Sequence, residues 1–248
     1  MDPIEYDVMA RVEDRHWWWR ARRDILSDFI GRFAPTPTRG ARRLVEVGCG
    51  SGGNLPMLSR FGEVLGAEHD AHAIDQLRRK RGGAFRVIRH TIPDPLPGPF
   101  DVLAMFDVLE HIRDDEAALD WAARQLSPGG VLIATVPAFG FLWTEQDDAV
   151  HHFRRYTPAT LAKRLPHNLE LLHLTCFNTI LFAPIATVRA AMNVLSRRNR
   201  PPRSHLGMPP APINSLFYHV FRQERHLLRR IRFPVGVSVL LVARHTTD

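Results

Sequence analysis

Short apolar runs recur along most of the chain, separated by segments with the spacing of amphipathic helices. Each run is five to nine residues long and rich in Val, Ile and Leu, which is typical of strands buried inside a sheet. Runs of this kind interleaved with helices predict an α/β fold with a doubly wound, Rossmann-like sheet of seven strands. The predicted strands span residues 44–48, 63–69, 84–90, 100–106, 130–137, 169–177 and 237–245.

Helix-capping residues support this order of elements. Asp114 or Asp115 can begin a helix that SPGG, residues 127–130, is expected to end. Thr157 followed by Pro158 predicts the start of another helix.

We interpret the chain as a single domain in four parts. Residues 1–38 form an aromatic-rich N-terminal helical cap that ends in a Pro/Thr/Gly linker, and residues 42–178 form the cofactor-binding core. Residues 179–233 are a helical insertion, because about sixty residues are far more than a strand connection needs. The insertion gathers its apolar residues on one helical face from Asn214 onward, which predicts that this face packs on another element. Residues 234–248 carry the last strand.

Charge is concentrated in the insertion. The chain has 248 residues and a formal net charge of +7, but residues 186–232 hold ten Arg and one Glu with no Lys or Asp. The remaining residues therefore sum to −2, so general nucleic-acid binding is not expected. The Arg-rich segment 186–232 predicts instead a phosphate, a peripheral membrane contact or a homodimer.

Cysteine content and the N-terminus both favour a cytoplasmic protein. Cys49 and Cys176 are too few for a disulfide framework, and neither has a Cys or His at zinc-finger spacing. The N-terminal residues carry early acids and lack an apolar signal-peptide core. The longest apolar stretch, 174–195, is interrupted by Asn178, Pro184 and Arg189, which argues against a spanning helix.

The first predicted strand runs directly into a glycine-rich turn, EVGCGSGG. Gly48, Gly50 and Gly52 allow the backbone to turn tightly and to approach a ligand. The string fits both GxGxG and GxGxxG, so the glycines alone do not separate a methyltransferase from an NAD(P)-dependent dehydrogenase. Glu68, at the end of the second strand, suits the ribose of either cofactor. Glu46 lies inside the first strand and indicates a cationic ligand.

Four motifs, EVGCGSG, GAEHD, FDVLAMFDVLEHI and LSPGGVLIATVP, resemble in this order the motifs of class I S-adenosylmethionine-dependent methyltransferases. The resemblance covers about residues 42–177 and implies a last strand that is antiparallel, with S-adenosylmethionine as cofactor and S-adenosylhomocysteine as product. It also implies that Glu46 holds the ammonium group, Glu68 the ribose, and His69 flanks the adenosine. The family often has an Asp after the third strand, whereas this chain offers Ile92 as an apolar contact. The predicted cofactor-binding residues are Glu46, Gly48, Cys49, Gly50, Gly52, Glu68, His69, Ile92, Phe106, Asp107 and Trp19.

The stretch DVLEH follows the fourth strand at its carboxyl end, where open α/β sheets bind ligands. Three interpretations remain open. His111 is a general base; or Glu110 braces the loop while His111 packs against it; or the group binds a divalent metal ion. The third interpretation rests on a resemblance to ubiquinone-biosynthesis O-methyltransferases and small-RNA 2′-O-methyltransferases, and we do not expect a bound metal. Its candidate ligands are Asp107, Glu110, His111 and His152.

Two further stretches resemble a bacterial branch of the same enzymes. HWWWRARRDIL, residues 16–26, is interpreted as a helix over the cofactor cleft in which Arg20 or Arg23 meets a carboxylate, rather than as a single-stranded nucleic-acid site. HHFRRYT places His152, Arg155 and Tyr156 on the acceptor side. The structural alternative is an Arg155 that pairs with Glu145 or Asp147 beside a packed tyrosine. The predicted catalytic residues are His111, His152 and Tyr156.

These observations predict S-adenosylmethionine-dependent methyl transfer to a small-molecule, sugar, peptide-amine or lipid-linked acceptor. Oxygen is favoured slightly over nitrogen as the methylated atom. The alternatives are a non-catalytic nucleotide-binding or interaction module and an NAD(P)-dependent dehydrogenase.

Overall fold

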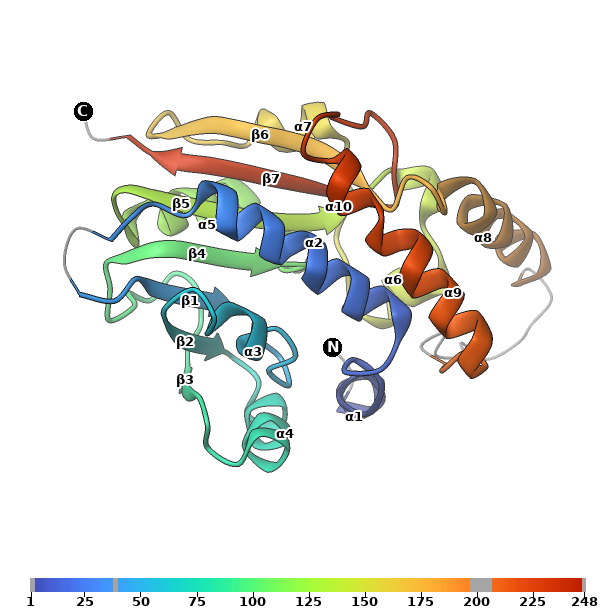
Figure 1. Ribbon diagram of the computed structural model, residues 1–248, viewed down its shortest axis with the longest axis horizontal. Coiled ribbons are helices and arrows are strands. Elements are labelled where there is room, and N and C mark those ends of the chain that lie inside the picture. The colour runs from blue at the N-terminus through green and yellow to red at the C-terminus, as the bar shows by residue number, and fades with distance from the viewer. Residues whose placement is uncertain (1–2, 38–39, 197–206, 247–248) are drawn as a thin grey trace.

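The computed structural model describes residues 3–37, 40–196 and 207–246. Within these ranges the strands form one seven-stranded sheet in the order β3-β2-β1-β4-β5-β7-β6. The first five strands are parallel, and β7 lies antiparallel between β5 and β6, so the predicted doubly wound sheet with an antiparallel last strand is confirmed (Figure 1). The strands are β1 (Arg43–Val47), β2 (Glu63–Glu68), β3 (Arg86–Arg89), β4 (Phe100–Phe106), β5 (Leu126–Pro137), β6 (Leu169–Phe177) and β7 (Ser238–His245).

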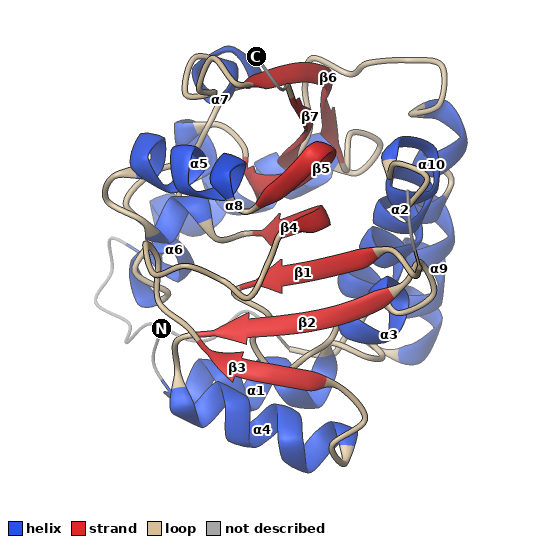
Figure 2. Cartoon of the chain, turned by 90° about the vertical axis from the view of Figure 1, so that its left-hand side faces the viewer, coloured by secondary structure: helices blue, strands red, loops and turns tan. Residues whose placement is uncertain are grey.

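Helices flank the sheet on both faces (Figure 2). They are α1 (Pro3–Val12), α2 (Trp17–Phe33), α3 (Leu55–Leu58), α4 (Ala71–Arg81), α5 (Asp115–Arg124), α6 (Glu145–Ala149), α7 (Pro158–Ala162), α8 (Phe182–Ser196), α9 (Ala211–Arg222) and α10 (Glu224–Leu227), with the 3₁₀ turns η1 (Leu109–His111) and η2 (Gly140–Leu142). Helices α2, α3 and α9 cover one face, and α5 and α7 cover the other.

Strand β4 shows why these runs are almost entirely apolar. Val102 and Ala104 are buried in the cluster beneath α2 and α9, whereas Leu103 and Met105 are buried in the cluster beneath α5. Successive side chains of a strand point to opposite faces, so a strand covered on both sides needs apolar residues at every position.

The fifth strand begins earlier than the pattern predicts. Leu126 already pairs with Phe100, before a register shift in the ladder between β4 and β5. Helix α5 is capped by the Asp114 side chain and ends at Arg124. The expectation that residues 127–130 end the helix is therefore wrong, because they belong to the start of β5. The predicted helix start at Thr157 is observed as the N-cap of α7.

The face of the insertion that begins at Asn214 packs along α2. The Asn214 side chain accepts a hydrogen bond of 2.8 Å from the first backbone N–H of α2. Arg222 pairs with Asp24 at 2.8 Å, and Arg229 pairs with Asp28. Two arginines of the segment predicted to bind a phosphate, a membrane or a second subunit are thus paired with carboxylates of the same chain. The others in the middle of that segment, Arg197, Arg198, Arg200 and Arg203, lie outside the described residues.

The stretch 174–195 is divided between β6 and α8. None of the helices in the described ranges is both long enough and apolar enough to cross a bilayer. The predicted linker joins α2 to β1, and its residues 38 and 39 fall outside the described part of the chain.

Candidate functional site

A cavity of about 650 Å³ opens at the carboxyl ends of β1, β2 and β4. Its wall includes Gly48 after β1, His69 after β2 and Asp107 after β4. Strand β1 lies between β2 and β4, so the chain order reverses beside this cavity. Open α/β sheets bind their ligands at such a switch point.

The glycine turn after β1 needs glycine at its first position. Gly48 has a φ of +69°, and a Cβ there would lie 2.7 Å from Cγ2 of Val108. The backbone N–H groups of Gly48 and Cys49 donate to the Ala67 carbonyl, and that of Gly50 donates to Glu68. Because these donors are already used within the protein, the turn is a poor cradle for the pyrophosphate of a dinucleotide.

Glu46 brings an unpaired carboxylate oxygen to this wall. The side chain is buried, Oε1 accepts a hydrogen bond of 2.7 Å from Asn54, and Oε2 has no partner among the described residues. Burial raises the pKa of Glu46 to about 8, against the opposing effect of Asn54. A buried acid with one free oxygen is well suited to a cationic group such as the ammonium of S-adenosylmethionine.

Glu68 lies buried in the same wall and is held in the ionised state. Its Oε1 accepts backbone hydrogen bonds from His69 and Asp70, and Oε2 accepts the bond from Gly50. Burial acts to raise its pKa, but the hydrogen bonds from His69, Asp70 and Gly50 outweigh burial and lower it. His69 Nδ1 lies 3.0 Å from Glu68 Oε1, and this bond raises the pKa of His69.

Most of the other predicted cofactor residues line the cavity, but not all of them. Gly52 is not among the residues that line the cavity, because it packs under Leu77. Trp18 and Trp19 of the predicted cap helix line the cavity, whereas Phe139, Phe141 and Trp143 after β5 do not. The predicted residues that line it are Glu46, Gly48, Cys49, Gly50, Glu68, His69, Ile92, Phe106, Asp107 and Trp19.

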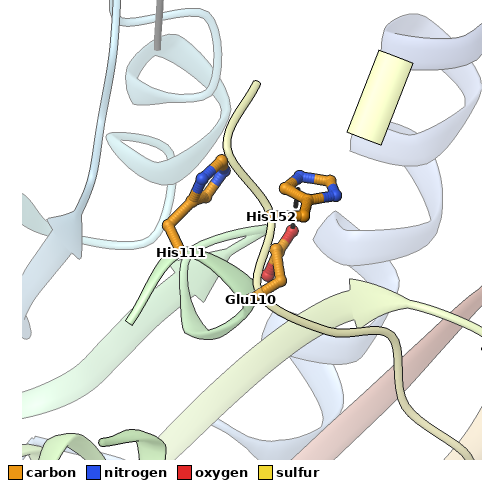
Figure 3. A group of neighbouring side chains, drawn as sticks. All are labelled: Glu110, His111 and His152. Carbon is orange, nitrogen blue, oxygen red and sulfur yellow. Dashed lines mark ion pairs between the residues drawn. The ribbon is translucent and has the colours of Figure 1, made fainter. Parts of the chain in front are cut away.

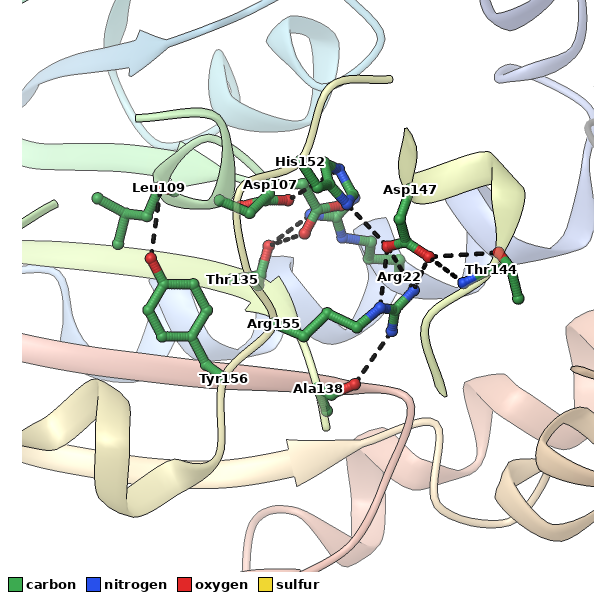
Figure 4. A network of polar contacts seen from close by, with 11 residues as sticks. Arg22, Asp107, Leu109, Thr135, Ala138, Thr144, Asp147, His152, Arg155 and Tyr156 are labelled. Carbon is green, nitrogen blue, oxygen red and sulfur yellow. Dashed lines mark hydrogen bonds and ion pairs between the residues drawn. The ribbon is translucent and has the colours of Figure 1, made fainter. Parts of the chain in front are cut away.

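Asp107 is held away from its sequence neighbours by an arginine from α2 (Figure 4). Its backbone has a φ of +57°, its Oδ2 lies 2.8 Å from Arg22 Nη1, and its Oδ1 accepts a bond from Thr135. Arg22, and neither Arg20 nor Arg23, is therefore the arginine that meets a carboxylate. Asp107 also does not belong to the compact group of candidate metal ligands.

That group consists of Glu110, His111 and His152 (Figure 3). One ligand atom from each side chain lies within 4.8 Å of the others. Glu110 is fully buried, and within the described part of the chain neither of its carboxylate oxygens has a hydrogen-bond partner. His152 Nε2 lies 3.9 Å from Glu110 Oε1. Burial, followed by the charge of Asp107, raises the pKa of Glu110 well above its usual range.

The two histidines differ in their environment. Their ring centroids lie 4.6 Å apart. Burial, followed by repulsion from His152, lowers the pKa of His111 to about 4, so His111 is neutral at physiological pH. His152 is instead oriented by Asp147, whose Oδ1 lies 2.8 Å from Nδ1. A carboxylate partner fixes the tautomer and the orientation of an imidazole.

Asp147 also pairs with Arg155, at 2.9 Å from Nε to Oδ1 and 2.9 Å from Nη2 to Oδ2 (Figure 4). Both side chains of this pair are almost completely buried. Tyr156 is buried as well, donates to Asp115 Oδ2 at 2.8 Å and does not line the cavity. The structure thus keeps His152 at the site and turns Tyr156 away from it, because the Tyr156 hydroxyl is used to anchor α5.

Comparison with known proteins identifies the family of this chain. A family model described as a methyltransferase domain matches residues 18–173, which is more than half of the chain. The chain belongs to the class I S-adenosylmethionine-dependent methyltransferases. Its cofactor is S-adenosylmethionine, in agreement with the free oxygen of Glu46 and the occupied N–H groups of the glycine turn.

Individual relatives of this methyltransferase are distant. It is similar to a ubiquinone biosynthesis O-methyltransferase of Cereibacter sphaeroides, 33% identical over 108 residues, 41% of this chain and 43% of the relative. It is also similar to a probable S-adenosylmethionine-dependent methyltransferase of Mycolicibacterium smegmatis, 28% identical over 131 residues, 51% of this chain and 48% of the relative. The matched part therefore spans about half the length of these relatives or less.

Among solved structures, the fold of the methyltransferase is shared by N-methyltransferase NodS from Bradyrhizobium japonicum in complex with S-adenosylhomocysteine. The TM-score is 0.54 at 14% identity, over 92% of this chain and 88% of that chain.

Sequence reasoning missed three residues of this site: Arg22, Asn54 and Arg189. Arg22 precedes Ile25 and Phe29 on the buried face of α2, so helical spacing carried a signal for it. Asn54 bonds Glu46 across the glycine turn and Arg189 bonds Leu142, 47 residues earlier, so the spacing of one helix or strand predicts neither contact.

Proposed function

We propose that the protein transfers the methyl group of S-adenosylmethionine to a hydroxyl oxygen of a small-molecule or carrier-linked acceptor. One observation carries the proposal: a single cavity holds both the unpaired oxygen of Glu46 and the group formed by Glu110, His111 and His152. S-adenosylmethionine supplies a methyl group on positively charged sulfur when it is bound. The second group faces the same space with side chains that can accept a proton.

The residues at the carboxyl ends of β1, β2 and β3 bind and orient the cofactor. Glu46 takes the ammonium, Glu68 takes the ribose hydroxyls, and Ile92 contacts the adenine. Trp18 and Trp19 exclude water from the wall on the α2 side. Positive charge is lost at sulfur during transfer, so a dry aromatic wall favours the reaction.

The histidines act on the acceptor. An oxygen acceptor carries a proton that must leave, and a positioned imidazole typically contributes 10²- to 10⁴-fold through proton transfer. His152 is the better placed to take this proton, because Asp147 holds its Nδ1 at 2.8 Å and so orients the ring. His111 stays neutral and accepts a hydrogen bond from the acceptor. The relatives named as O-methyltransferases support oxygen as the target.

A divalent ion bound by Glu110, His111 and His152 is a second candidate for activating the acceptor. The observation in its favour is the buried carboxylate of Glu110, whose two oxygens have no hydrogen-bond partner among the described residues. Such an ion would lower the pKa of an acceptor hydroxyl. Without an ion, the raised pKa of Glu110 keeps its carboxyl group protonated. The site is therefore physically acceptable both with and without a bound ion.

Radiolabelled S-adenosylmethionine with a panel of catechols, hydroxylated sugars and amines tests the proposal. We expect label on an oxygen acceptor, and a drop of about 10²- to 10⁴-fold in kcat for His152→Ala, with S-adenosylhomocysteine affinity unchanged within about three-fold. Label found only on amines would contradict the choice of oxygen. Binding of the cofactor without any product from the panel or from cell extract would favour a non-catalytic module.

Chelation separates the two ways of activating the acceptor. Full activity after dialysis against EDTA would exclude the metal ion, whereas activity that is lost and then restored by Mg²⁺ or Mn²⁺ would support it.

Both cysteines are buried and unpaired, which supports a reducing, cytoplasmic compartment for this reaction.

A further inference from the structure

Arg189 on α8 reaches the wall of the cavity from the insertion. Its Nη1 donates to the Leu142 carbonyl at 2.9 Å, and within the described residues Nε and Nη2 have no hydrogen-bond partner. No carboxylate in the described ranges pairs with it, unlike Arg222 and Arg229, which pair with Asp24 and Asp28. A half-buried guanidinium at a ligand cavity without a counter-charge is electrostatically unfavourable unless a ligand supplies one.

Asp147, whose charge favours the protonated form of Arg189, is already committed to other partners. Asp147 accepts both arms of Arg155 and the Nδ1 hydrogen bond of His152. Burial, followed by repulsion from Arg155, lowers the pKa of Arg189 to about 10, and Asp147 only partly opposes this. One positive charge therefore remains uncompensated at this end of the cavity.

The position of Arg189 separates it from the cofactor residues. Glu46 and Glu68 come from β1 and β2, whereas Arg189 contacts η2, which follows β5. Glu110 and His111 follow β4, which lies between β1 and β5 in the sheet, and His152 lies in the loop after α6. The uncompensated charge is thus on the far side of the proton-accepting group from the cofactor, where the acceptor must lie.

The cavity also offers apolar wall to an acceptor. Ile112, Val150 and Phe153 line the same cavity. Helix α8 is held against η2 by a second bond, from Asn193 Nδ2 to the Trp143 carbonyl at 2.8 Å, so the position of Arg189 is fixed from two points.

We propose that Arg189 binds an anionic group of the acceptor, a carboxylate or a phosphate, and thereby turns the acceptor's hydroxyl toward His111 and His152. The proposal rests on the function proposed above and narrows its substrate class to acceptors with an apolar body and one anionic end. A guanidinium binds either oxyanion through paired N–H donors.

Three probes that share a phenyl ring test this assignment: benzoate, phenyl phosphate and benzyl alcohol. Each is titrated into the full-length protein saturated with S-adenosylhomocysteine, and dissociation constants are measured by ligand-observed NMR. We expect at least one anionic probe to bind about ten-fold tighter than benzyl alcohol or better. A preference for benzoate would assign a carboxylate acceptor, and a preference for phenyl phosphate would assign a phosphate.

Arg189→Gln should reduce this preference to about two-fold, and Arg189→Lys should keep part of it. Arg230→Gln removes the same charge from an exposed position outside the cavity and should leave the preference unchanged. Equal binding of all three probes by the wild-type protein would overturn the proposal without reference to any variant. So would an unchanged preference in Arg189→Gln, or a loss of S-adenosylhomocysteine affinity instead. Failure of the proposed function would appear separately, as anion binding through Arg189 without methyl transfer.

Discussion

Replacement of Glu46 by Gln tests whether this buried carboxylate holds the ammonium of the cofactor. Without ligand the pKa of Glu46 is about 8, so the group is mostly protonated at neutral pH. Binding of the ammonium requires the carboxylate and must therefore release a proton. Ionising Glu46 costs about 0.8 kcal/mol at pH 7.5 and about 2.7 kcal/mol at pH 6, since one pKa unit corresponds to about 1.36 kcal/mol.

The expected effect follows from these costs. A hydrogen bond to a charged group contributes about 1.5–3 kcal/mol net, so Glu46→Gln should weaken S-adenosylhomocysteine binding by about 3- to 40-fold at pH 7.5. At pH 6 the ionisation cost offsets this gain, and the two proteins should bind almost equally. Wild-type affinity should fall by up to about eight-fold as the pH drops from 7.5 to 6.5 and then level off near the affinity of Glu46→Gln.

Isothermal titration calorimetry in two buffers of different ionisation enthalpy measures both the affinity and the released protons. We expect the wild-type protein to release about 0.9 proton at pH 7, and Glu46→Gln to release almost none from this position. Glu63→Gln, at the exposed start of β2, is the matched control and should behave as wild type. Wild-type affinity that does not change with pH, with no proton released, would refute the assignment of the ammonium to Glu46.

Two further predictions concern stability. Asp147→Asn should lower the free energy of unfolding by about 3–5 kcal/mol in urea titrations, because it leaves the buried Arg155 without its carboxylate partner. Asp120→Asn, at an exposed position of α5, should leave the free energy of unfolding unchanged. Although burial opposes it, the bonds from His152 and Arg155 lower the pKa of Asp147; its contribution to stability should therefore be complete above about pH 4 and decline as the pH falls further. Phe221→Ala should cost about 3–5 kcal/mol, because the ring is fully buried and packs against both Trp18 and Phe177. Leu216→Ala on the exposed side of the same helix should stay within about 0.5 kcal/mol, and equal losses in the two variants would contradict the packing of α9 on α2.

Local sequence determined the sheet and the cofactor end of the site. Strands covered on both faces must be apolar at nearly every position, so the seven runs could be read directly. The turn at Gly48 needs a backbone conformation that favours glycine, and Glu46 is anomalous in a buried strand. Both signals depend only on residues close together in the chain, which is why the sequence alone predicts a cofactor site at this end of the sheet.

The acceptor end was decided by tertiary structure. DVLEH looked like one cluster, but the positive φ of Asp107 and its ion pair with Arg22 separate it from Glu110 and His111. Tyr156 lies beside Arg155 in sequence, yet it turns into the core to bond Asp115. Arg189 reaches the cavity only because α8 folds back onto η2. Pairing between charged side chains depends on distances across the fold, and the identity of an arginine does not reveal whether the fold will supply its carboxylate.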